Sequence, residues 1–390
     1  MLIINPYSYI SIKKEGVFVI KKIIIIAVNA LCLIAFIVCL SVSAAIKTPL
    51  RSQQAARAWA GQSGERFAQL SAFFPDSYGF DEDSIRRFRF SLDNILQAAS
   101  LESTPERTLY TDAWSTTADV YIHDSRGPFP AKAIAVGGDF FLFHPFSLRD
   151  GSYLFPDDVM KDRVLLDEEL AWRLFGAARV SGFELIINGK PFVVAGVLSR
   201  ETDFANSRAY TYGAGLFMSY DALFDMTEGN VSIETYEIVM PDPITGFALK
   251  SFTDAIGDSN VQIVENSARF TLGNSFALIG SFGERSLRTE AVTFPYWENA
   301  ARYVEDWLAL LLIFSLLFIA FPVVCTVIYG VKIIRFGIDR GKLEVKKAID
   351  RKDKREYEKY LKEHGREPQI YDINDIIREV QEEDTTEQES

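Results

Sequence analysis

Two uninterrupted apolar runs divide the chain. The first extends from Ile23 to Ile46 and the second from Trp307 to Val331, and neither contains a charged residue. Because about 20 helical residues cross the hydrocarbon core of a bilayer, each run is long enough to span a membrane. The pattern predicts transmembrane helices at residues 23–46 and 305–331, with one large domain at 47–304 between them.

Basic residues flank both runs on the side away from this middle domain. Lys21 and Lys22 precede the first run, and Lys332 follows the second. Segments rich in lysine and arginine stay on the cytoplasmic side of the membrane. We therefore predict a two-pass protein of the plasma (inner) membrane with both termini cytoplasmic: an N-terminal segment at 1–22, an extracytoplasmic middle domain, and a charged tail at 332–390.

The first run also has a second interpretation. A basic start, an apolar stretch and the small residues Val42, Ser43 and Ala44 are typical of a secretory leader that is cleaved. The apolar stretch is longer than the roughly 7–15 residues of such leaders, which favours a retained helix. Cleavage after the first run stays open at this point.

Helical spacing of apolar residues recurs within the middle domain. It predicts a helix over 82–99, with Asp81 and Asp83 near its start, and an Ala-rich helix over 49–74 that is closed by Pro75. Two shorter helices are predicted over 167–175 and 245–256.

Short runs rich in β-branched residues alternate with these helices. Strands are predicted at 118–123, 132–137, 163–166, 215–218, 236–240 and 261–264. Asn188-Gly189, flanked by β-rich runs within 182–198, is a strong hairpin signal. Residues 266–304 are expected to be loop and helix returning to the membrane. The fold class predicted for the middle domain is α+β with mixed sheets.

The tail is densely charged. Residues 339–364 alternate acidic and basic side chains at helical distances, which predicts a solvated helix supported by ion pairs. Residues 382–390 are too polar to pack and are expected to be disordered. The sequence leaves two roles open for the tail helix: contact with a partner protein, or a solvated extension.

Composition narrows the functional classes. The formal net charge is −12, and the acidic excess lies in the middle domain, which argues against nucleic-acid binding. The three cysteines, Cys32, Cys39 and Cys325, all lie in the apolar runs. No disulfide therefore staples the middle domain, which is long enough to bury a core without one.

No residues show the spacing of a catalytic or metal-binding site. The three histidines are His123, His144 and His364. His144 lies five positions after Asp139 and could serve a metal or an acid–base step, but a hydrogen-bonded structural histidine is the more common case. Gly182 to Lys190 lacks the spacing of a phosphate-binding loop. We predict no catalytic, cofactor-binding or metal-ligating residues, no cofactor, and no ATP hydrolysis by this chain.

Three segments of the middle domain occur in a familiar order. They are Leu148–Phe155, Arg163–Gly176, whose helix ends in Leu-Phe-Gly, and Gly182–Leu198, a hairpin that ends in Val-Ala-Gly-Val-Leu. This order resembles the periplasmic core domain of MacB-type ABC transporter permeases, most strongly over 120–240. The matched glycines and apolar residues are structural, so they identify a fold and not a catalytic site.

The resemblance implies a permease-like subunit in a larger assembly. In that family a separate ABC ATPase subunit hydrolyses ATP, other permease subunits take part, and movement of the external domain exports or releases a substrate. Family members usually have four spans and act as pairs, which makes a dimer an open expectation. This chain has two predicted spans, a shortened form, so the alternative is a membrane-anchored sensor or adaptor that does not itself transport.

Overall fold

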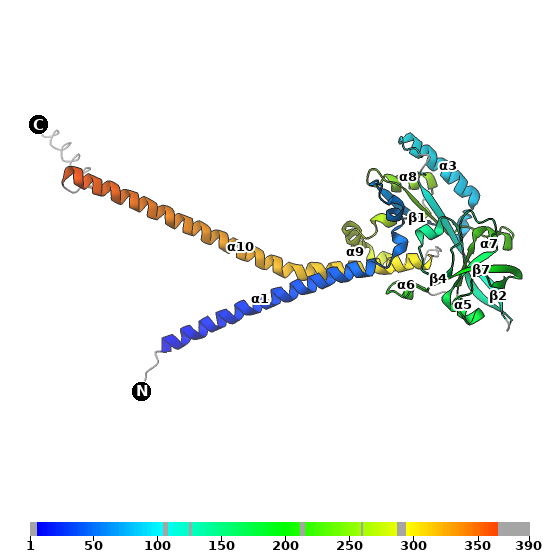
Figure 1. Ribbon diagram of the computed structural model, residues 1–390. Helices are drawn as coiled ribbons and strands as arrows, with labels where there is room; N and C mark the ends of the chain where they lie inside the picture. Colours follow the sequence, from blue (N-terminus) through cyan, green and yellow to red (C-terminus); the bar gives the residue numbers. More distant parts are fainter. Residues whose placement is uncertain are drawn as a thin grey trace. The chain divides into compact units, whose positions relative to one another are not determined.

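The computed structural model describes residues 6–103, 108–124, 127–210, 215–258, 260–286 and 294–365 (Figure 1). It forms two compact units, of which the first ends at Phe318 and the second begins at Ile319. The first unit contains the folded domain together with the first apolar helix and the start of the last helix. The second unit contains the rest of that last helix.

A ten-stranded mixed sheet forms the centre of the domain. Its strands are β1 (Phe67–Phe73), β2 (Thr111–Asp124), β3 (Gly127–Gly138), β4 (Leu148–Gly151), β5 (Arg163–Asp167), β6 (Glu184–Ile187), β7 (Lys190–Leu198), β8 (Gly215–Ser219), β9 (Thr235–Pro241) and β10 (Gln262–Glu265). The order is β10-β1-β9-β2-β3-β8-β5-β7-β4, and β6 pairs with β2 and β7. Only the β3–β8 and β5–β7 pairs are parallel among the described strands. The predicted α+β class is confirmed.

The described residues form ten α-helices. They are α1 (Pro6–Lys47), α2 (Ala55–Ala60), α3 (Glu82–Ala98), α4 (Phe140–Phe143), α5 (Glu168–Phe175), α6 (Asn206–Ala209), α7 (Tyr220–Met226), α8 (Phe247–Ile256), α9 (Leu272–Ser286) and α10 (Tyr296–His364). Of these, α2, α3, α4, α5, α7 and α8 pack against this sheet. Short 3-10 turns form η1 (Arg51–Gln53), η2 (Asp76–Tyr78) and η3 (Asn266–Ala268).

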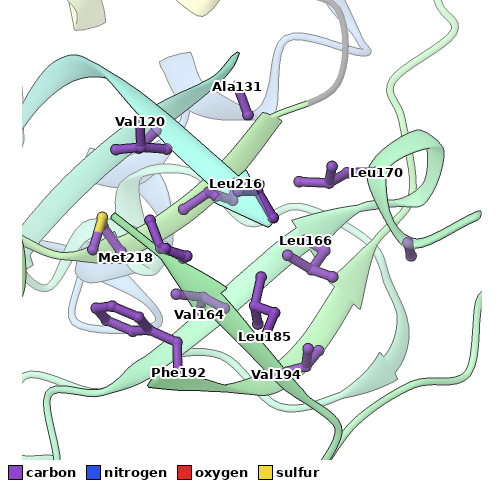
Figure 2. Packing of buried hydrophobic residues seen from close by; sticks show 14 of the residues in the cluster. Val120, Ala131, Val164, Leu166, Leu170, Leu185, Phe192, Val194, Leu216 and Met218 are labelled. Carbon is purple, nitrogen blue, oxygen red and sulfur yellow. The ribbon is translucent and has the colours of Figure 1, made fainter. Parts of the chain in front are cut away.

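Three apolar clusters fill the layers between the sheet and the helices. Figure 2 shows the first, in which Leu170 of α5 packs with Leu166, Leu216 and Val194 of neighbouring strands. A second cluster packs α3 and α8 against β1 and β9. A third packs α2, α4 and the first turn of α10 against the middle of the sheet. This third cluster therefore attaches the first turn of α10 to the domain.

Local signals account for the elements that were predicted correctly. Helix α5 begins where the Asp167 side chain accepts a hydrogen bond of 2.6 Å from the Leu170 N–H, and it ends at Gly176 with a φ of 69°. Asn188 and Gly189 take φ values of 46° and 79°, as a type I′ hairpin turn requires. Both motifs lie in segments that carry the resemblance described above.

The prediction of a helix over 49–74 is wrong. Only η1 and α2 are helical there, Gly61 and Gly64 have positive φ, and Phe67–Phe73 forms β1, which pairs with β9 and β10. Gln69 and Ser71 are buried in this strand although their polarity suggested an exposed helix face. A central strand that is buried on both faces loses the alternation that identifies strands.

The hairpin of β2 and β3 is longer than the predicted strands at 118–123 and 132–137. Pro128 and Pro130 lie in β3 opposite His123 and Tyr121. Proline lacks an N–H donor and normally stops a strand prediction. One side of β3 pairs with β2, and the other side pairs with β8 only from Lys132 onward. Both prolines precede Lys132, so they lie where β3 is not paired with β8.

Two helices among the described residues are long and apolar enough to cross a membrane. One covers Ile20–Lys47 and the other lies within Tyr296–Glu363, with mean hydropathies of 3.1 and 2.9 in their most apolar windows. Helix α10 continues without a break to His364, and its last part carries the ion pairs Lys352–Glu356 and Lys359–Glu363, which confirms the predicted tail helix. Residues 382–390 lie outside the described part of the chain.

Candidate functional site

The two long apolar helices, α1 and α10, meet the folded domain in one buried region. We call it the junction, and it comprises residues 46–56, 266–269 and 296–308. Within it the first turns of α10 lie deep in the domain, since Tyr296 and Trp297 are each only 3% exposed. Ile46 of α1 and Leu50, just after α1 ends, pack against the alanines and other apolar residues in the first turns of α10.

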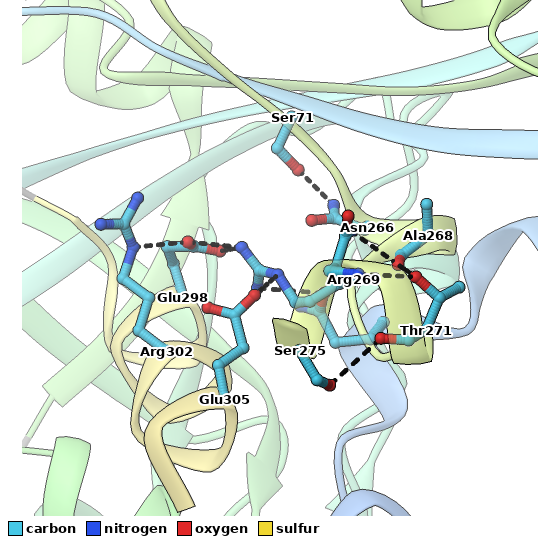
Figure 3. Close-up of polar contacts among 11 residues, drawn as sticks. Ser71, Asn266, Ala268, Arg269, Thr271, Ser275, Glu298, Arg302 and Glu305 are labelled. Carbon is cyan, nitrogen blue, oxygen red and sulfur yellow. Dashed lines mark hydrogen bonds and ion pairs between the residues drawn. The ribbon is translucent and has the colours of Figure 1, made fainter. Parts of the chain in front are cut away.

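Arg269 is the centre of the junction (Figure 3). Its guanidinium donates two hydrogen bonds, of 2.6 and 2.8 Å, to the Glu298 carboxylate of α10. It also forms an ion pair of 3.2 Å with Glu305 and donates to the side-chain oxygen of Gln53 at 3.2 Å. Arg302 donates a further hydrogen bond of 2.7 Å to Glu298. One guanidinium therefore contacts both the segment that follows α1 and the first turns of α10.

Burial makes these charges interdependent. Desolvation alone would raise the pKa of Glu298, but the Arg269 and Arg302 guanidinium groups and their hydrogen bonds lower it below its ordinary value. The same burial opposes the charge of Arg269, and the Glu298 and Glu305 carboxylates raise its pKa overall. Removing one member would leave the remaining buried charges with fewer partners, which is more costly than removing an exposed pair.

A line of buried polar contacts continues from the junction into the sheet. Asn266 donates through its side chain to the Ser71 hydroxyl at 2.6 Å, and Ser71 donates to Glu237 at 2.9 Å. The other oxygen of Glu237 lies 2.5 Å from Nε2 of His144. These contacts join η3 to β1, β9 and the segment after α4, so the junction is hydrogen-bonded to the middle of the domain.

Gln69 of β1 ties the segment after α1 to the same strand. Its side-chain oxygen accepts from the Ala55 N–H at 3.0 Å, and its side-chain nitrogen donates to the Ser52 carbonyl at 2.7 Å. Its backbone N–H donates to the Ser267 hydroxyl at 2.8 Å. A single buried amide thus connects the residues after α1 with β1 and η3.

Aromatic side chains complete the junction. The Trp297 ring lies 5.5 Å from Phe140 and 4.4 Å from His144, measured between ring centroids. The Phe294 ring lies 5.0 Å from Phe73 of β1, and the Arg302 guanidinium lies 3.8 Å from the Phe294 centroid. The start of α10 is therefore held by ion pairs on one side and by aromatic packing on the other.

The histidine and carboxylate that the sequence singled out are not brought together. His144 is fully buried and pairs with Glu237, so it is hydrogen-bonded as expected. Asp139 instead accepts a hydrogen bond of 2.5 Å from the Thr111 hydroxyl. His123 is exposed on β2, and the side chain of His364 lies outside the described part of the chain.

A cavity of about 700 Å³ lies elsewhere on the domain, between α3, α7 and the end of β3. Arg89 donates two hydrogen bonds of 2.7 Å to Asp112 on its wall, and Tyr236 donates to the same carboxylate at 2.5 Å. These charges neutralise each other. Across the described residues no group of three or more histidine, cysteine or acidic side chains is arranged to hold a metal ion.

Comparison with known proteins identifies the domain. A family model described as the MacB-like periplasmic core domain matches residues 23–268. This chain belongs to the MacB-like periplasmic core domain family. The match begins in the first apolar helix and ends one residue before Arg269, so α9 and α10 lie beyond it.

Two solved structures are similar to this MacB-like chain. The periplasmic region of MacB from Actinobacillus actinomycetemcomitans is 18% identical, with 57% of this chain and 94% of that chain covered and a TM-score of 0.37. The extracellular domain of the noncanonic ABC-type transporter YknZ from Gram-positive bacteria is 11% identical, with 50% and 99% covered and a TM-score of 0.35. No curated protein matched the chain.

The junction of this MacB-like chain was not predicted from its sequence. Arg269 and Glu298 are separated by 29 positions, and neither belongs to a recognisable motif. The available signal was weak: Glu298 and Glu305 are seven positions apart, which places them on the same face of a helix as the apolar Ala301 and Leu308. Two acids on an apolar helix face require a buried cation, but the sequence does not say which one.

Glu201, beside the junction, gives a testable pH dependence. Burial, followed by the charge of Asp203, raises the pKa of Glu201 to about 7, while its contact with Tyr296 and the charge of Arg51 act in the opposite direction. The folded chain therefore binds more protons than the unfolded chain between the ordinary glutamate pKa of 4.5 and about 7. The contribution of Glu201 to stability is largest below this window and is lost as the pH rises through it.

We expect Glu201→Gln to melt at a higher temperature than the parent at pH 8 and at a similar temperature at pH 4.5. Thermal unfolding of both proteins in detergent, measured across this pH range, tests the prediction. Glu102→Gln, at an exposed position, serves as the control and should shift neither value. Equal melting temperatures of Glu201→Gln and its parent at pH 8 would contradict the argument.

Proposed function

We propose that this chain is a permease-like membrane subunit of an ABC transporter. In this proposal a separate ATPase subunit binds on the cytoplasmic side and moves the spanning helices. The junction carries that movement to the extracytoplasmic domain, which then exports or releases a substrate. The proposal includes two spans, both termini in the cytoplasm, and other permease subunits in the same assembly.

One observation carries the proposal: the buried Arg269 links both membrane-directed segments to one folded domain. It contacts Gln53 after α1 and Glu298 in α10, and Asn266 of the same turn is bonded to β1. A flexible tether would need none of these buried contacts. A relay needs them, because packed side chains and buried ion pairs are what transmit the movement of a helix to a domain.

Exposed apolar residues on the tail helix support the proposal that a cytoplasmic partner binds there. Ile334, Ile338, Val345 and Ile349 are all more than half exposed. Their spacing of four, seven and four residues places them on one face of the helix. Exposed apolar residues with this spacing are typical of a helix that binds in the groove of a partner. We propose that this stripe is the contact surface for the ATPase.

Co-purification tests the proposal. The full chain, isolated from native membranes in mild detergent, should bring down an ABC ATPase and further permease subunits, and its loss should change their ATPase activity. Purification of the chain alone, together with unchanged ATPase activity in its absence, would contradict the proposal and favour the membrane-anchored sensor or adaptor. That alternative is supported by the small number of candidate spans, two among the described residues.

A charge on the apolar stripe should separate the subunits. We expect Val345→Glu combined with Ile349→Glu to reduce the amount of co-purified ATPase at least about tenfold, the cost of burying unpaired carboxylates in an apolar groove. Lys354 lies nine positions after Val345, on the opposite face of the helix. Lys354→Gln combined with Lys347→Gln changes the net charge by the same amount and should leave co-purification unchanged. Equal losses in both pairs would exclude the stripe as the contact.

A further inference from the structure

The first half of helix α9 exposes large apolar side chains, which is unusual for a helix on a water-exposed domain. Among residues 272–280, the part of α9 whose side chains are described, the buried one is Ser275, which is 7% exposed. Leu272 and Phe276, one turn apart, are 70% and 51% exposed. A helix that faces water on one side places its polar residues there and its apolar residues inward. The outer face of α9 is therefore suited to an apolar surrounding.

An apolar hollow of about 430 Å³ adjoins this helix. Ile279 of α9 lines one side, and Trp307, Ala309, Leu310 and Ile313 of α10 line the other, so that Asp306 is the only charged residue among its described lining residues. The α10 residues belong to the outer end of the second predicted span. The hollow is thus continuous with the surface that the span presents to lipid.

Aromatic and basic side chains mark the level of the membrane surface at this end of the span. Phe204 packs on Tyr303 and Trp307 with centroid distances of 5.2 and 5.7 Å. Arg208 lies over the rings of Phe204 and Tyr303 and donates a hydrogen bond of 2.5 Å to the Tyr303 hydroxyl. Aromatic belts of this kind collect where hydrocarbon meets lipid headgroups.

We propose that α9 is an interfacial helix that lies in the outer leaflet and that the hollow between α9 and α10 holds a lipid acyl chain. The ligand class follows from the lining, which offers apolar contact and a single carboxylate. The span ends beside the hollow, which makes bilayer lipid the nearest apolar material. This inference rests on the proposed second span, goes beyond the proposed relay and does not depend on the identity of the ATPase.

An interfacial α9 would fix the distance of the junction from the bilayer surface. Helix α9 follows Arg269 after two residues, and Asn274 donates to the Ala268 carbonyl at 2.8 Å, so α9 is anchored directly to the η3 turn. An amphipathic helix embedded in the headgroup region resists movement normal to the membrane. The junction would then transmit movement while α9 holds the η3 turn at the bilayer surface.

Spin-label accessibility in vesicles tests this proposal. The full chain, with Cys32, Cys39 and Cys325 replaced by alanine, is labelled at Phe276→Cys or Ile279→Cys and reconstituted into vesicles of phosphatidylethanolamine and phosphatidylglycerol. Collision with oxygen, which concentrates in acyl chains, is compared with collision with a water-soluble nickel chelate. Phe90→Cys, an exposed phenylalanine of α3, is the water control, and Leu317→Cys in the span is the lipid control.

We expect the labels at 276 and 279 to collide with oxygen more than with the nickel chelate, as the label at 317 does, and the label at 90 to show the reverse. Nickel accessibility at 276 equal to that at 90 would overturn the proposal. Inaccessibility to both agents, with dipolar coupling between labels at 276, would show that a second copy of the chain covers α9 and would also overturn it. None of these outcomes depends on co-purification of the ATPase.

Discussion

Replacing Arg269 by methionine is expected to lower the free energy of unfolding of the outer domain by about 3–5 kcal/mol, the usual cost of breaking a buried ion pair. The loss arises because Glu298, which is 2% exposed, would keep only one of its two guanidinium partners, Arg302, and Glu305 would lose the guanidinium that lies 3.2 Å away. Denaturant unfolding of the full chain in detergent, followed by tryptophan fluorescence, measures the change.

Two further variants separate the buried charge from the loss of a large side chain. Arg86→Met breaks an ion pair with Asp83 in which both side chains are more than 60% exposed, and it should cost less than about 1 kcal/mol. Arg269→Met combined with Glu298→Met should recover part of the stability lost by Arg269→Met alone, since a buried carboxylate that has lost one of its two cations is removed as well. Similar losses for Arg269→Met and Arg86→Met would show that the junction charges do not hold α10 in place.

Replacing Trp297 by alanine is the second large effect, expected to destabilise the domain by about 3–5 kcal/mol. The ring is 3% exposed and packs on Phe140, His144 and Tyr296. The same unfolding measurement applies. Trp172→Ala is the matched control, because Trp172 on α5 is 56% exposed and its loss should change stability by no more than about 0.5 kcal/mol.

Trp297→Phe tests which property of the side chain matters. No hydrogen-bond partner for the indole N–H is found within the described residues, so phenylalanine forfeits no bond and keeps most of the apolar contact. Its loss should be less than half that of Trp297→Ala. A loss as large as that of alanine would point to a role for the indole nitrogen, and no loss in Trp297→Ala would mean that α10 is not seated on this cluster.

The sequence predicted elements whose determinants are local. Helix α5 follows from its cap at Asp167 and its terminal Gly176, and the β6–β7 hairpin follows from Asn188 and Gly189. The long apolar helices follow from length and composition alone. Each of these signals lies within a few residues of the structure that it specifies. The amino-acid sequence alone was therefore sufficient to predict these elements.

The elements that escaped prediction depend on distant partners. Strand β1 contains the polar residues Gln69 and Ser71, which are buried only because Ser52, Ala55 and Glu237 supply their hydrogen-bond partners. The junction was missed for the same reason. Periodicity describes which face of an element is apolar, but it does not pair a buried charge with a counter-charge on another element.

The central claim of the proposed function is that a domain outside the membrane is held between two spanning helices. Membership of the MacB-like family and the geometry of the junction both support it. Cysteine labelling with a membrane-impermeant maleimide in intact cells tests this claim most directly. The single exposed cysteines Ser63→Cys, Thr202→Cys and Asp350→Cys are compared in a chain whose native cysteines are replaced by alanine.

We predict that positions 63 and 202 react in intact cells and that position 350 reacts only after the cytoplasmic membrane is permeabilised. Reaction of positions 202 and 350 under the same condition would place the domain and the tail on one side of the bilayer. That result would contradict the proposed relay between a cytoplasmic ATPase and an external domain.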